Sequence, residues 1–127
     1  MVCAVMLAST ASLMAGLDAP VVETPEVLQR AAMFGDATAQ FKLAMAYLEG
    51  SSTLPKDPAK AAEWFRKAAT AGLAAAQYNL GVLLSNGKDM PRNDKEAALW
   101  FSAAAKNGNF EAQVMMVRFL GTGRGVE

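Results

Sequence analysis

The segment Ala31-Ala32-Met33-Phe34-Gly35-Asp36-Ala37-Thr38-Ala39-Gln40 carries a pattern that occurs twice more in this chain. Its signature, Ala-Ala-x-x-Gly-x-x-x-Ala-Gln, returns at residues 68–77 and at residues 104–113. The glycines of the three copies, Gly35, Gly72 and Gly108, are separated by 37 and then 36 residues. A period of this length is typical of stacked supersecondary units, so the sequence predicts a repeat solenoid.

Each unit is expected to consist of two helices joined by a loop. The first helix of the first complete unit, at about residues 36–49, has apolar residues at helical spacing and stops near a glycine. A second helix follows Asp57 in one unit and Asn93 in the next, because such side chains cap helix N-termini. Thr24 caps a leading helix that ends at Gly35. No stretch alternates with a period of two, so the predicted fold class is all-α.

The helices are expected to pack closely because small alanines lie on the facing sides of both. Large side chains among these alanines are predicted to fill the gap to the neighbouring unit: Trp64, Phe65, Trp100 and Phe101. Gly72 and Gly108 are predicted to hold a left-handed conformation that ends the second helix of each unit.

Composition excludes several classes of function. The 127 residues include 12 basic and 12 acidic side chains, so we expect no nucleic-acid partner. Histidine is absent from the sequence, which removes the commonest general base and metal ligand. The single cysteine, Cys3, has no metal-ligating neighbours. We therefore expect no catalytic residues, no metal and no cofactor, and a protein that is not an enzyme.

The N-terminal part leaves two interpretations open. Residues 2–17 contain no charged side chain, which fits an export signal or membrane anchor, or equally an alanine-rich helix that caps the first repeat. We take residues 1–23 as this apolar segment with its linker, and residues 24–127 as the solenoid. Membrane contact is expected only if the segment is an anchor, and an exported and a cytoplasmic location stay equally open.

At this point the residues resemble a known family, and the likeness rests on one run: Asp57, then Lys60-Ala61-Ala62-Glu63-Trp64-Phe65-Arg66-Lys67-Ala68-Ala69, Gly72, Ala76-Gln77-Tyr78 and Leu80-Gly81. They are similar to the Sel-one-like repeat (SLR) family, a relative of the tetratricopeptide repeat. The resemblance covers about residues 25–126. It implies a right-handed superhelix of αα-hairpins that works as an adaptor, here with two full hairpins and a half repeat at each end.

Members of this family occur in bacterial signalling, in cell-surface regulation and in eukaryotic degradation complexes. Its cysteine-rich bacterial members staple each hairpin with a disulfide, and this sequence lacks the required cysteines. The β-lactam-related activity proposed for those members is therefore not carried over to this chain.

The resemblance also implies a binding surface, because the non-core positions of the first helices face a concave groove. Two rows of residues occupy these positions: Phe41, Tyr78 and Val114 in one, and Met45, Val82 and Arg118 in the other. Apolar side chains with one arginine suit a peptide or a helix of a protein partner. The predicted function is a non-enzymatic protein-interaction scaffold of bacterial type. The alternative is an exported cell-envelope or signalling regulator whose repeats sense or restrain a membrane partner.

The last predicted helix, at residues 109–121, is apolar nearly all round. The residues responsible are Val114, Met115, Met116, Val117, Phe119 and Leu120. A solenoid needs polar end faces to remain soluble, so this helix is expected to be covered. We predict self-association through it, and residues 2–17 of a second copy are one candidate for the cover.

Overall fold

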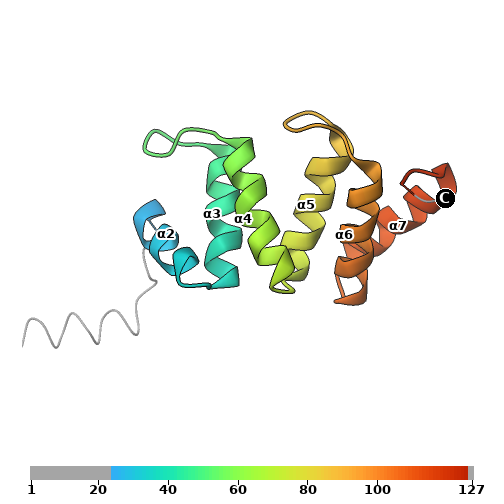
Figure 1. The fold of residues 1–127 in the computed structure, drawn as a ribbon, viewed down its shortest axis with the longest axis horizontal. Coiled ribbons are helices and arrows are strands. Elements are labelled where there is room, and N and C mark those ends of the chain that lie inside the picture. The colour runs from blue at the N-terminus through green and yellow to red at the C-terminus, as the bar shows by residue number, and fades with distance from the viewer. Residues whose placement is uncertain (1–23, 126–127) are drawn as a thin grey trace, which may run out of the picture.

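The computed structural model describes residues 24–125, which form six helices and no strand. The helices are α2 (Pro25–Met33), α3 (Ala37–Glu49), α4 (Pro58–Thr70), α5 (Ala74–Asn86), α6 (Asp94–Lys106) and α7 (Phe110–Thr122). They follow one another along the long axis of the molecule, from α2 at one end to α7 at the other (Figure 1). This confirms the all-α repeat architecture. The expected signal, anchor or capping helix within residues 1–23 lies outside the described residues.

Every extensive contact joins two helices that are neighbours along the chain. The hairpins α3–α4 and α5–α6 pack most closely, and α2 and α7 extend the stack at its two ends. Figure 1 shows the long loops after α3 and α5 at one edge and the short turns before α3, α5 and α7 at the other. Each unit thus contacts only the next one, which is the arrangement that a repeat of this period predicts.

The ten-residue signature forms the short turn between two units. The backbone N–H of Asp36 donates to the carbonyl of Ala31 at 3.2 Å, and that of Gly35 donates to Ala32 at 3.1 Å. Gly35 has φ +93°, and the Asp36 carboxylate then caps α3 by accepting from the N–H of Ala39 at 3.1 Å. The same two backbone bonds recur in the later turns, at Gly72-Leu73 and Gly108-Asn109. With φ values of +98° and +91°, Gly72 and Gly108 confirm the predicted left-handed conformation.

The glutamine that closes the signature ties each unit to the one before it. Its side-chain amide donates to a carbonyl in the last turn of the preceding helix: Gln40 to Ala32 at 3.1 Å, Gln77 to Ala69 at 3.0 Å and Gln113 to Ala105 at 3.4 Å. Gln40 and Gln77 are buried, whereas Gln113 is exposed. Buried amides need such partners, which explains why a glutamine recurs at this position of the signature.

The core combines small alanines with leucines and with one buried phenylalanine on each of α4, α6 and α7. Phe65 and Phe101 are completely buried, while Trp64 and Trp100 are half-buried at the edge of the core. Both phenylalanines contact a ring on the first helix of their own hairpin, and Phe101 also contacts Phe119 of the next unit, with ring centroids 5.3 Å apart. Gly81 allows α5 and α6 to approach closely, because a Cβ atom there would lie 2.7 Å from the Phe101 ring.

The turn that follows α7 folds back onto the start of α6. The Arg124 guanidinium binds the Asp94 carboxylate at 2.8 Å and the carbonyl of Ser85 at 2.9 Å. Arg92 binds the same carboxylate at 2.7 Å. Hydrogen bonds from these two arginines hold the pKa of Asp94 well below its ordinary value of 3.8. A second close contact is made by Gly125, where a Cβ atom would lie 2.1 Å from the Asp94 carbonyl oxygen.

We predict that Gly81→Val lowers the free energy of unfolding by about 1–3 kcal/mol, because the new side chain overpacks against Phe101. Adding Phe101→Leu should recover part of this loss by making room. Gly121→Val is the matched control, since a Cβ atom added at this helical glycine would meet nothing within 4 Å. Urea denaturation measures all four proteins, and equal stability of Gly81→Val and the control would contradict the close approach.

We predict that Asp94→Asn lowers the melting temperature at neutral pH but not in strong acid. Because the folded chain depresses the pKa of Asp94, its stabilising contribution is complete above the ordinary value of 3.8 and is lost as the pH falls below it. Melting curves from pH 7 down to the acid limit of folding would show the gap to the native protein narrowing. Asp89→Asn, in the preceding loop, is the control, and a gap independent of pH would contradict the prediction.

Candidate functional site

The six residues expected to line a groove occupy matching positions on α3, α5 and α7. Counted back from the glycine that ends each of these helices, one row lies nine positions away and the other five. Phe41, Met45, Tyr78 and Val82 are half-buried and pack against the core, while Val114 and Arg118 are exposed. The surface that the rows offer therefore becomes more open towards α7.

The first row is anchored by aromatic contacts with the second helices. The Phe41 ring lies 5.8 Å from that of Phe65, and the Tyr78 ring lies 5.8 Å from that of Phe101. Val114 has no ring to make such a contact, and 41% of its surface is exposed. Packing on the core fixes the two aromatic side chains, and a rigid apolar surface binds a partner with little loss of side-chain entropy.

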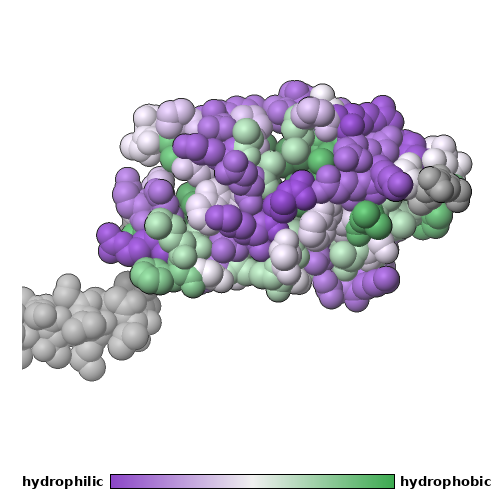
Figure 2. All heavy atoms as spheres, in the orientation of Figure 1, coloured by the Kyte–Doolittle hydropathy of each residue, from purple (hydrophilic) through white to green (hydrophobic). Residues whose placement is uncertain are grey.

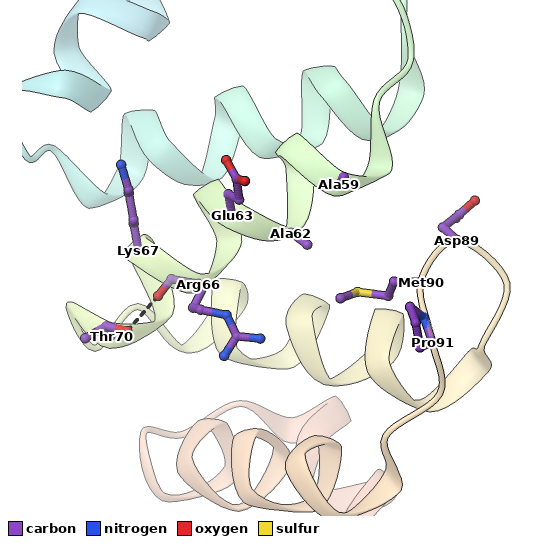
Figure 3. Close-up of a pocket in the computed structure, with 9 residues that line it drawn as sticks. All are labelled: Ala59, Ala62, Glu63, Arg66, Lys67, Thr70, Asp89, Met90 and Pro91. Carbon is purple, nitrogen blue, oxygen red and sulfur yellow. Dashed lines mark hydrogen bonds between the residues drawn. The ribbon is translucent and has the colours of Figure 1, made fainter.

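A separate open pocket of about 840 Å³ lies between α4 and the loop that precedes α6. The side of α4 contributes Ala59, Ala62, Glu63, Arg66, Lys67 and Thr70, and the loop contributes Asp89, Met90 and Pro91. Figure 3 shows Met90 reaching from the loop towards α4. The side chains of Glu63, Lys67 and Asp89 point away from the pocket. The floor of the pocket is thus apolar, and its charged groups stand at the rim.

An ion pair joins α4 to α6 beside this pocket. Arg66 forms an ion pair with Glu96, and the indole N–H of Trp100 donates to the same carboxylate at 3.3 Å. The hydrogen bond from Arg66 lowers the pKa of Glu96 below its ordinary value. Both side chains of the ion pair are partly exposed, so it contributes little to stability and mainly fixes the position of Arg66.

Smaller hollows lie on the other two second helices. One of about 540 Å³ is lined by Phe34 and by four α2 residues whose counterparts line the α4 pocket: Glu26, Gln29, Arg30 and Met33. A smaller one of about 270 Å³ lies on α6 beside Leu99. On α6 the turn after α7 covers part of this side, because Gly125 packs on Ala98, the counterpart of Ala62. Figure 2 shows mostly hydrophilic groups in the middle of the visible face, with hydrophobic groups near its two ends.

Sequence reasoning did not find the α4 pocket. Its lining comes from a helix and from the loop of the next unit. The repeat period does not predict how far apart these two elements lie in space. One signal was present, because the loop pair Met90-Pro91 places an apolar side chain where a solvated loop would be polar. In the part of the chain that the structure describes, no helix is long and apolar enough to cross a membrane. The same residues contain no cluster of acidic or sulfur ligands suited to a metal ion.

Two solved structures are similar to this chain. A Sel1 repeat protein from Oxalobacter formigenes is 34% identical, with a TM-score of 0.76 over 81% of this chain and 42% of its own length. The protein c5321, a protective antigen of uropathogenic Escherichia coli strains with an SLR fold, is 35% identical, with a TM-score of 0.77 over 82% of this chain and 22% of its own. This chain therefore spans less than half the length of either. No curated protein matches the sequence.

The family model of the Sel1 repeat matches residues 37–73 and 74–109, which together make up more than half of the chain. The two matches coincide with the hairpins α3–α4 and α5–α6 and the turns that follow them. Proteins built from these repeats are generally scaffolds for protein interactions. Repeat signature, helix order and sequence match agree, and the chain belongs to the Sel1 repeat family.

Proposed function

We propose that this chain is a non-enzymatic scaffold module that binds a peptide segment of a protein partner along α3, α5 and α7. The observation that carries the proposal is the repetition of two partly open register positions on all three helices. Five of the six side chains there are apolar or aromatic, and the sixth is Arg118. Membership of a family of interaction scaffolds supports binding as the activity.

The arrangement favours a partner with apolar anchors and one acidic side chain. Tyr78 and Phe41 offer fixed aromatic surface, which is the kind of contact that dominates binding energy at interfaces. Arg118 is exposed on α7 and can form a two-pronged hydrogen bond to a carboxylate. The partner would thus lay apolar residues across α3 and α5 and place its acidic residue at α7.

A peptide display library selected on the immobilised chain tests the proposal. We expect the selected peptides to combine apolar residues with an acidic one and to lose at least about tenfold in affinity for Val114→Glu/Arg118→Glu, since 1.4 kcal/mol corresponds to tenfold. Both positions are exposed, so the variant should fold normally. Tyr78→Ala is less suitable, because it would also remove the contact with Phe101.

Two controls separate this surface from the rest of the molecule. Leu99→Glu changes an exposed apolar residue on α6 and should leave the affinity unchanged. Met90→Glu introduces a charge into the α4 pocket and should also have no effect on these peptides. Peptides that bind Val114→Glu/Arg118→Glu normally but lose affinity for Met90→Glu would move the binding site to the α4 pocket and refute the groove.

A further inference from the structure

The outward stripe of α7 is exposed at positions that are buried in the other first helices. Val117 is 70% exposed and Leu120 is 63% exposed. When positions are counted back from the glycine that ends each helix, Val117 corresponds to Ala44 and Gly81. Leu120 corresponds to Tyr47 and Leu84. All four counterparts are buried. Gln113 follows the same rule, since Gln40 and Gln77 at its position are buried and it is not.

In the other units, the structure shows which element covers these positions. The second helix of the same hairpin packs there, α4 against α3 and α6 against α5, in the closest contacts of the fold. Among residues 24–125 no helix takes this place beside α7, whose extensive helix contacts are with α6. The exposed stripe on α7 thus occupies the positions at which the other first helices pack against the second helix of their hairpin.

The other end of the molecule presents the complementary element. α2 has the register of a second helix, because Gly35 follows it as Gly72 follows α4 and Gly108 follows α6. Thr24, which caps α2, and Ala31 are half-buried, and Val27 is 46% exposed. Their counterparts on α4 and α6 are covered more fully: Ala61, Ala97, Ala68 and Ala104 are completely buried, and Trp64 and Trp100 are half-buried. The side of α2 that a first helix would cover is therefore open to any partner outside residues 24–125.

Side-chain sizes at the two ends also match. Within the second hairpin the glycine at position 81 makes room for the Phe101 ring. On α7 the corresponding residue is the larger Val117, and on α2 the counterpart of Phe101 is the smaller Leu28. A larger residue on one side and a smaller one on the other conserve the packed volume, which is the change that helix interfaces tolerate best.

We propose that α7 of one copy packs against α2 of a second copy and so completes a hairpin between two chains. The stripe of Val117 and Leu120 would meet the stripe of Thr24, Val27 and Ala31. This contact joins different surfaces of the two copies, so it is heterologous and leaves one α2 and one α7 free at the ends of the assembly. Association then continues to longer chains unless the curvature closes a ring.

Two variants with one blocked end each test the proposal in the full chain. Val117→Lys/Leu120→Lys blocks α7, and Val27→Lys blocks α2; all three positions are exposed, and circular dichroism and melting curves check the fold. The native chain should show a mass in sedimentation that rises with concentration beyond two copies. Each variant alone should remain a monomer, because its free end finds no complement. An equal mixture should give a 1:1 dimer and nothing larger, identified by native mass spectrometry with one variant labelled with ¹⁵N.

The remaining outcomes decide against the proposal. A native chain that stays a monomer at all concentrations overturns the proposal. Association of Val27→Lys to the same extent as the native chain also overturns it, because α7 would then pair with itself or with another surface. Leu7→Lys/Met14→Lys places charges in residues 2–17. Association lost in this variant but kept in Val27→Lys would assign the cover to that segment and overturn the role of α2. Leu99→Lys, an exposed apolar residue at neither end, should associate normally, and its failure would show that general stickiness drives assembly.

Discussion

The fold depends on one recurring joint, in which a glutamine amide donates a hydrogen bond to a carbonyl in the last turn of the preceding helix. The carbonyl of Ala32 or Ala69 accepts both this bond and the N–H of the left-handed glycine that ends the helix. One acceptor thereby fixes where a second helix stops and how the next first helix lies across it. A buried amide without its acceptor costs about 1–3 kcal/mol, so each joint strongly favours one angle between units. Since units contact only their neighbours, repetition of the joint determines the course of the whole stack.

Much of this could be predicted from the sequence because the joint uses residue types with few alternatives. Glycine is required where φ is positive, Asp36 and Asn93 are efficient caps, and alanines allow the helices to approach. The boundaries of α3, α4, α5 and α6 follow from these constraints. The prediction that tryptophans fill the gap to the neighbouring unit was less accurate. Trp64 carries the Lys67 ammonium over its ring at 4.5 Å and stays half-buried, which a wide indole at the edge of the core allows.

The surface features were harder to predict because they arise where the repeats differ. Arg66 reaches Glu96 in the next unit, and Arg124 reaches Asp94 and the carbonyl of Ser85, and neither pair has an equivalent elsewhere in the described repeats. A periodic pattern reveals what the copies share, while such contacts depend on the three-dimensional stagger of long side chains. The α4 pocket was equally hard to predict, because part of its lining comes from the loop of the next unit. The expected groove rows stay a prediction, because their register is visible in the sequence but a partner for them is not.

The two proposed surfaces are related through the geometry of the repeat. If α2 of a second copy completes the hairpin begun by α7, its α3 follows α7 as α5 follows α3 within one chain. The row that runs through Phe41, Tyr78 and Val114 would then continue with Phe41 of the next copy. A partner with several binding segments would engage successive copies, and the effective concentration of the second segment would raise the overall affinity without any new type of contact. A short repeat array would in this way offer a long binding surface whose length depends on the concentration of the chain.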